Sequence, residues 1–165
     1  MSAPERLRYD LVQVAAWRGG EAALAGRLRA AGWELPPFGQ VWARDGRIAC
    51  SVRPQRWLLA AETGGMRPGA TLAEASLAAV GETGAVTDLS AARGAWRVTD
   101  PKARERLAAG CRLDLDPAAF PAGRAAVTLI AQVPVMLACL DDGWLLMAPS
   151  SMSGHVEAWL HHAVG

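Results

Sequence analysis

The chain has 165 residues; 52% are apolar, 20% are charged, and the formal net charge is +1. This balance excludes a disordered chain, and it supplies no block of positive charge for binding nucleic acid or an anionic membrane. The first ten residues do not resemble a secretory signal, and no window approaches the roughly 20 apolar residues of a membrane helix. Cys50, Cys111 and Cys139 form no C-x-x-C pair, which is typical of reduced thiols in a cytoplasmic protein.

The first half of the chain predicts a strand, a helix, three more strands and a second helix. Residues 11–17 are apolar and partly β-branched, which favours a strand, and residues 21–31 predict a helix that Gly32 ends. Asp45-Gly46 is the preferred two-residue turn of a hairpin, so strands are expected on both sides of it. The other elements of this half are the hairpin strands at 40–44 and 47–52, a strand at 56–61, and a helix at 71–80 that opens with a Thr-x-x-Glu capping box.

The second half predicts the same kinds of element. Asp100 can cap a helix whose first residue is Pro101, and Gly110 ends that helix. Asp142-Gly143 predicts a hairpin turn, and Pro134, which cannot donate to a strand ladder, marks a bend or an edge. The remaining elements are strands at 84–90, 95–99, 125–132, 135–140 and 144–147 and a last helix at 153–163.

The order strand, helix, loop, three strands, helix therefore occurs twice, over residues 9–80 and 94–164, and we place the two lobes at residues 9–80 and 84–164. Residues 27–32 (RLRAAG) parallel residues 106–110 (RLAAG), which indicates two similar lobes, although chance similarity in a chain rich in Ala, Leu and Gly is the alternative. We predict an α+β fold in which one domain, residues 1–165, consists of two small antiparallel-sheet and helix lobes, as in tandem ferredoxin-like units. A lobe of about 80 residues is marginally stable alone, so we expect the lobes to share a core.

Motifs that would hold a phosphate, a nucleotide or a metal ion are absent from the sequence. The only lysine follows Pro101, and no glycine-rich phosphate loop precedes a helix. His155, His161 and His162 lie on the last predicted helix, without a cysteine or an acidic residue at the spacing of zinc ligands. We therefore predict no cofactor-binding residue and no metal ligand in this chain.

Candidate nucleophiles and general bases are equally weak. Cys50 and Cys139 fall within predicted strands, and Cys111 in a loop has no base beside it in sequence that would activate the thiol. Paired carboxylates such as Asp141-Asp142 can do acid–base work, but their position before Gly143 between apolar runs favours a turn. The sequence predicts no catalytic residue.

Seven tryptophans stand beside two phenylalanines and one tyrosine. Most of them fall within predicted strands or helices, which favours packing in the core. Tryptophan is also enriched at binding hot spots, because it covers a large area with few rotatable bonds. Some of the seven are therefore expected in the core, and the alternative is an interface with a partner.

Five segments resemble the gamma subunit of heterotetrameric sarcosine oxidase. The most specific are residues 107–115 (LAAGCRLDL) and 120–123 (FPAG), which carry the pattern GC-x-LDL followed by F-x-x-G. Residues 86–90 (VTDLS), 96–103 (WRVTDPKA) and 56–59 (RWLL) fit the same family. The resemblance covers most of the chain, from about residue 40 to residue 160.

This resemblance implies a fold like the folate-binding domain of the glycine-cleavage aminomethyltransferase. It also implies a complex of alpha, beta, gamma and delta chains that demethylates sarcosine oxidatively to glycine and passes the one-carbon unit to tetrahydrofolate. In that family the other chains hold FAD, FMN, NAD and zinc, and gamma carries no cofactor. We therefore expect a non-catalytic subunit that acts by binding the alpha, beta and delta subunits and is inactive alone.

Two departures bear on this expectation. Aminomethyltransferases have a catalytic aspartate in the hairpin after the F-x-x-G strand, whereas residues 131–135 (AQVPV) contain no acid. Near the last helix, gamma subunits usually have Arg-Ser-Phe, whereas residues 150–152 are Ser-Ser-Met. The alternatives are a free-standing folate-binding protein of the aminomethyltransferase type and a gamma-like subunit of a related N-methyl amino-acid oxidase.

Overall fold

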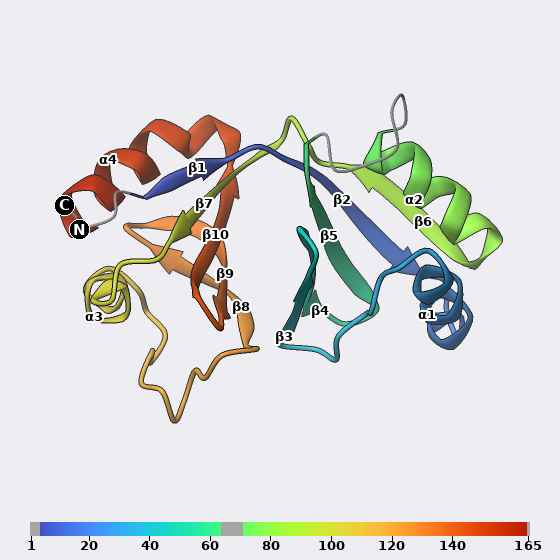
Figure 1. The fold of residues 1–165 in the computed structure, drawn as a ribbon, viewed down its shortest axis with the longest axis horizontal. Coiled ribbons are helices and arrows are strands. Elements are labelled where there is room, and N and C mark those ends of the chain that lie inside the picture. The colour runs from blue at the N-terminus through green and yellow to red at the C-terminus, as the bar shows by residue number, and fades with distance from the viewer. Residues whose placement is uncertain (1–3, 64–70, 165) are drawn as a thin grey trace. The chain divides into compact units, whose positions relative to one another are not determined.

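A computed structural model describes residues 4–63 and 71–164 (Figure 1). The chain divides into two units, which we call the middle unit, Arg8–Ser90, and the terminal unit, Met1–Leu7 with Ala91–Gly165. Each unit contains a five-stranded sheet, and every strand pair in both sheets is antiparallel. No helix in the described ranges is long and apolar enough to span a membrane. The fold is therefore mixed α and β with two antiparallel sheets.

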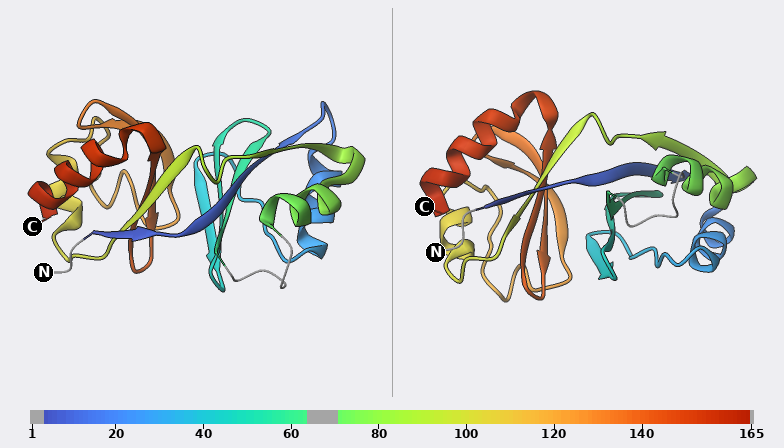
Figure 2. Two further views of the ribbon diagram at one scale, coloured as in Figure 1. Left: turned by 90° about the horizontal axis from the view of Figure 1, so that it is seen from above. Right: turned by 45° about the horizontal axis from the view of Figure 1, so that its top comes forward.

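The sheet of the middle unit has the strand order β3-β4-β5-β2-β6, and two helices pack beside each other against it (Figure 2). Its core joins Val12 and Val14 of the sheet to Leu24, Leu28 and Leu72 of the helices, all of them fully buried. The elements are β2 (Tyr9–Ala16), α1 (Glu21–Ala30), β3 (Gln40–Arg44), β4 (Arg47–Arg53), β5 (Arg56–Glu62), α2 (Leu72–Val80), the 3-10 turn η1 (Gly81–Thr83) and β6 (Gly84–Asp88).

Two local predictions are confirmed in this unit. Asp45 and Gly46 form the hairpin turn, with φ angles of 51° and 73°, because the twist of paired strands favours left-handed turn residues. The capping box is also present. The hydroxyl of Thr71 accepts a hydrogen bond from the backbone N–H of Glu74 at 3.2 Å, and the Glu74 carboxylate accepts one from the N–H of Thr71 at 2.9 Å. Residues close in sequence therefore determine where α2 begins.

The terminal unit has the strand order β1-β7-β10-β9-β8, and its helices α3 and α4 contribute to the same buried cluster as the sheet. Trp96, Leu137 and Leu146 of the sheet meet Leu107 of α3 and Leu160 of α4 in this cluster. The elements are β1 (Glu5–Leu7), β7 (Arg93–Val98), α3 (Ala103–Ala108), β8 (Ala125–Ile130), β9 (Val133–Leu140), β10 (Gly143–Pro149), the 3-10 turn η2 (Ser150–Met152) and α4 (Ser153–Val164).

The edge strands are exchanged between the two halves of the chain, which the sequence did not predict. β1 precedes the first half but pairs with β7 in the terminal unit. β6, which the sequence places in the lobe 84–164, pairs with β2 in the middle unit. The middle unit therefore extends to Ser90 and includes the strand at 84–88. A pattern of apolar residues predicts a strand, but it does not specify the neighbour with which that strand pairs.

Two further details concern the meander β8-β9-β10. Gly143 already pairs with Leu140, so the last turn is Asp141-Asp142 and the predicted turn Asp142-Gly143 is wrong by one residue. Gly143 has a φ of 143°, and an added Cβ would lie 2.6 Å from the carbonyl oxygen of Val98. Pro134 pairs with Leu129 of β8 and lies beyond the last residue that β10 pairs. β9 is an inner strand of the sheet, so only this end of it lacks a second neighbour where Pro134 cannot donate.

Candidate functional site

The three cysteines differ in how far they are exposed. Cys50 and Cys139 are buried, and burial raises the pKa of the Cys50 thiol to about 12. Burial also raises the pKa of Cys139, although the guanidinium of Arg104 opposes this shift. Cys111 is half-buried, and its sulfur accepts a hydrogen bond from the backbone N–H of Leu113 at 3.4 Å. The nucleophilic form of a thiol is the thiolate, so the two buried cysteines are poor nucleophiles.

The histidines of α4 contact the backbone and are not joined with other metal-binding side chains. Nε2 of His155 lies 3.0 Å from the carbonyl oxygen of Ala131, and Nδ1 of His162 lies 2.7 Å from that of Ala158. Among the residues that the structure describes, no group of three or more His, Cys, Asp or Glu side chains could hold a metal ion.

Of the two turns of the meander β8-β9-β10, only the second carries acids, Asp141 and Asp142. Ala131 and Gln132 form the β8–β9 turn with φ angles of 49° and 69°, and neither carries an acid. In the next turn Asp142 forms an ion pair with Arg97 of β7, so this carboxylate fastens the turn to the sheet. A general base must reach its proton within hydrogen-bond distance, and the β8–β9 turn has no group for this task.

The tryptophans lie mostly inside the two units. Trp33, Trp96 and Trp144 are buried, which agrees with the expected packing in the core. Trp17, at the end of β2, has 55% of its surface exposed. The large apolar side chains that are exposed among the described residues are Trp17, Phe38, Leu77, Val127 and Met152. Such side chains are candidates for contact with a partner, because removing apolar surface from water is favourable.

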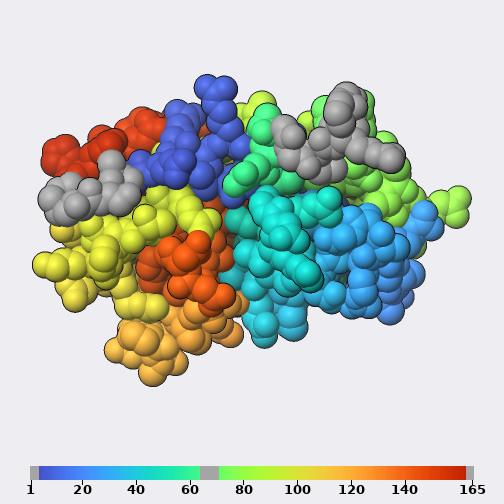
Figure 3. Space-filling view, viewed as in Figure 1, coloured from blue at the N-terminus to red at the C-terminus, as the bar shows by residue number. Residues whose placement is uncertain are grey.

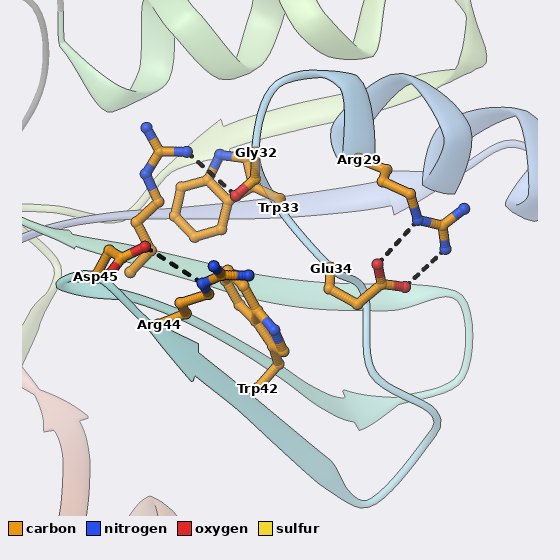
Figure 4. A pocket seen from close by; sticks show the side chains of 8 residues that line it. Arg29, Gly32, Trp33, Glu34, Trp42, Arg44 and Asp45 are labelled. Atoms are coloured by element: carbon orange, nitrogen blue, oxygen red, sulfur yellow. Dashed lines mark hydrogen bonds and ion pairs between the residues drawn. The ribbon is translucent and has the colours of Figure 1, made fainter.

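A pocket of about 560 Å³ opens on the middle unit (Figure 4). It lies between the C-terminal end of α1, the loop after this helix, and the β3–β4 hairpin. The segment that contains this hairpin is at the surface in the space-filling view (Figure 3, cyan). The ring centroids of Trp33 and Trp42 lie 6.4 Å apart with their planes at 57°. The lining residues are Arg29, Gly32, Trp33, Glu34, Trp42, Arg44, Asp45 and Arg47.

Two of the three arginines in this pocket have a carboxylate partner. Nε and Nη2 of Arg29 donate to the two carboxylate oxygens of Glu34 at 2.9 and 2.7 Å, which lowers the pKa of Glu34 and raises that of Arg29. Nε of Arg44 lies 3.4 Å from Asp45, with 75% and 85% of the two side chains exposed. An ion pair this exposed stabilises the hairpin little.

Arg47 has a different environment. Its Nη1 donates to the carbonyl oxygens of Ala31 and Gly32 at 3.0 and 3.2 Å, at the C-terminal end of α1. Its guanidinium carbon lies 5.4 Å from the ring centroid of Trp33. The sequence did not predict this pocket, because its residues come from two segments, 29–34 and 42–47, that no motif connects.

No protein-family model matches the chain. It is similar to two curated proteins named sarcosine oxidase subunit gamma. The protein from Corynebacterium sp. strain P-1 is 36% identical over 150 residues, which cover 88% of this chain and 70% of the relative. The protein from Arthrobacter sp. is 34% identical over 148 residues, with 88% and 70% covered.

A comparison with solved structures also finds a sarcosine oxidase. A chain of the heterotetrameric sarcosine oxidase from Corynebacterium sp. U-96, in complex with pyrrole 2-carboxylate, matches 97% of this chain and 82% of its own length, with a TM-score of 0.81 and 31% identity. The glycine cleavage system aminomethyltransferase T from Bartonella henselae matches 96% of this chain and 45% of its own length, with a TM-score of 0.67 and 17% identity, which shows a shared fold alone. The chain thus belongs to the family of sarcosine oxidase gamma subunits.

Proposed function

We propose that this chain is the gamma subunit of a heterotetrameric sarcosine oxidase and acts by binding the alpha, beta and delta subunits. The observation that carries the proposal is the 36% identity to a gamma subunit over 88% of the chain. The match to a chain of a heterotetrameric enzyme, with a TM-score of 0.81, supports it further. The complex would demethylate sarcosine oxidatively in the cytoplasm, where three unpaired thiols remain reduced.

The proposal includes the absence of a reactive centre in the isolated chain. The high pKa of Cys50 and the acid-free β8–β9 turn support it, because neither site offers an ionised nucleophile or a general base. FAD, FMN, NAD and zinc would be held by the other subunits. On the fold, we propose that the two units are tandem ferredoxin-like relatives of each other, supported by the two antiparallel sheets and their paired helices.

Co-expression tests this function directly. The chain is produced with the alpha, beta and delta subunits, and the mixture is separated by size exclusion and assayed for sarcosine oxidation. We expect this chain to elute with the complex, and we expect no turnover when it is assayed alone. Elution of this chain apart from an assembled complex, or turnover of any N-methyl amine by the chain alone, would contradict the proposal.

A pair of variants adds information on the contact surface. Trp17→Glu places a charge on a side chain that is 55% exposed, whereas Arg53→Glu changes an exposed residue that is already charged. Desolvating a charge is costly, so a contact through Trp17 predicts that only the first variant weakens co-elution. Equal co-elution of both variants would remove Trp17 from the interface and leave the proposed subunit role intact.

A further inference from the structure

Among the described residues that line the pocket of the middle unit, Arg47 is a cation that no carboxylate neutralises. Arg47 uses Nη1 for the carbonyls of Ala31 and Gly32, and its Nε and Nη2 have no partner among residues 4–63 and 71–164. These two N–H groups form the edge of the guanidinium that binds a carboxylate with two parallel hydrogen bonds. Arg29 binds Glu34 in the same pocket with its own Nε and Nη2.

Arg47 is also held in place before any ligand arrives. It stacks at 5.4 Å on Trp33, whose side chain is only 4% exposed, and two backbone carbonyls fix Nη1. A side chain that is already ordered loses little conformational freedom on binding. The free edge of Arg47 is therefore a preformed site for an anion.

The other walls of the pocket indicate what the anion is attached to. Trp42 is half-buried and presents an indole ring tilted by 57° from Trp33. Arg44 is 75% exposed, and its contact with Asp45 is weak, so its guanidinium can turn to a second anionic oxygen. An indole wall beside two cations suits a carboxylate on a flat or apolar group, since aromatic surfaces attract such groups.

We propose that this pocket binds a carboxylate carried by a flat or apolar group, with Arg47 as its two-point partner, Arg44 as a second cation and Trp42 as the apolar wall. This inference goes beyond the proposed subunit role and does not depend on it. The carboxylate can belong to a free small molecule or to an acidic side chain of a partner segment, and the test separates these two sources.

The seven tryptophans allow a direct measurement on the full chain. Each contributes one indole N–H signal to a ¹⁵N–¹H spectrum, and the variants Trp42→Phe and Trp33→Phe identify the two signals from the pocket. Sodium benzoate and a capped glutamate-containing tripeptide are the probes, and benzamide is the neutral control. We expect a saturable shift of the Trp42 signal with at least one carboxylate probe, and not with benzamide, while the indole signals that neither variant removes stay in place.

Two arginine variants form a matched pair. Arg47→Gln should weaken carboxylate binding about tenfold, whereas Arg29→Gln, which removes a cation already bound to Glu34, should change it by less than about threefold. Arg47→Lys keeps the charge but not the two-point edge, and it should restore part of the affinity. If the spectrum of Arg47→Gln shows that this variant is unfolded, Arg44→Gln in the β3–β4 hairpin serves instead, and it should weaken carboxylate binding about threefold.

The possible results separate the sources and can overturn the inference. Binding of benzoate alone identifies a small-molecule site, and binding of the tripeptide identifies a site for a partner segment; both support the proposal. No saturable shift of Trp42 with either carboxylate, equal binding of benzamide, or equal losses in the Arg47 and Arg29 variants would overturn it.

Discussion

The two units fasten the loop after their first helix with the same pair of residue types, an arginine stacked on a tryptophan. In the terminal unit the guanidinium carbon of Arg104 lies 4.8 Å from the ring centroid of Trp144. Nη1 of Arg104 donates to the carbonyl oxygens of Leu115 and Phe120, and Phe120 stacks on Trp144 in turn. These hydrogen bonds are part-buried, and they stabilise the loop between α3 and β8.

In the middle unit Arg47 makes the corresponding contacts to Trp33 and to the carbonyls of Ala31 and Gly32, but at the wall of an open pocket. Its Nε and Nη2 have no partner among the described residues, so three of its five N–H groups remain available to a ligand. The same pair of residue types thus serves two purposes. With part-buried hydrogen bonds it stabilises a loop, and at the wall of a pocket it leaves a fixed cation for binding.

Replacing each arginine with methionine tests this difference most strongly. Arg104→Met removes charged donors from two partly buried carbonyls, so we expect the free energy of unfolding to fall by about 3 kcal/mol. Arg47→Met removes exposed contacts, and we expect a loss of about 1 kcal/mol or less. Thermal and urea unfolding followed by circular dichroism measure both. Equal losses of stability in the two variants would show that the hydrogen bonds of Arg104 stabilise the protein no more than those of Arg47.

The reactivity of the cysteines reports how well the interior of each unit excludes solvent. At pH 8 a thiol with a pKa of about 12 has roughly a thousandfold less thiolate than an ordinary cysteine, so Cys50 should not react in the folded protein. Cys139 is also buried, and only the half-buried Cys111 should react with an aromatic disulfide reagent. Counting the released thiolate with and without urea gives the number of reactive thiols. Rapid release that persists in Cys111→Ser would contradict this assignment.

The capping box of α2 gives a test of a local interaction in the middle unit. Thr71→Ala removes the hydroxyl that accepts from the N–H of Glu74, and it should cost about 1 kcal/mol of stability. Thr71→Ser keeps an oxygen at this position and is the matched control. Unfolding midpoints measured for both variants decide the matter, and a Ser variant as unstable as the Ala variant would count against the cap.

The smallest effect is expected from acid. Hydrogen bonds from the N–H of Thr71, from Arg29 and from the N–H of Ser90 lower the pKa values of Glu74, Glu34 and Asp88. A lowered pKa in the folded state stabilises the protein above the unfolded value of about 4, and this contribution is lost as the pH falls through the folded value.

Amide exchange measures this loss. After correction for intrinsic rates, protection at the start of α2 should decrease between pH 6 and pH 3, because Glu74 becomes protonated. Thr71→Ala, which lacks the cap already, should show a smaller decrease. Unchanged protection of α2 in the wild-type chain over this range would contradict the assigned role of Glu74.

Much of the local structure could be predicted, because the deciding residues are neighbours in sequence. Asp45-Gly46 and the capping box at Thr71 illustrate this, and Gly110 follows α3 as expected. At Gly110 an added Cβ would overlap the ring of Trp159, so its second role in packing lay outside the local pattern. The pocket around Arg47 was not predicted, because its walls come from residues 29–34 and 42–47, which only the fold brings together.

By itself, the sequence determined most of the elements, the lack of a known reactive motif and the likeness to the gamma subunits, because each of these depends on residues in short runs. Only the tertiary structure decided that β1 and β6 pair outside their own halves of the chain, and that the hydrogen bonds of Arg104 are part-buried whereas those of Arg47 lie at the wall of a pocket. Strand pairing and side-chain burial depend on distant residues, and a pattern of apolar and polar positions leaves several partners nearly equivalent.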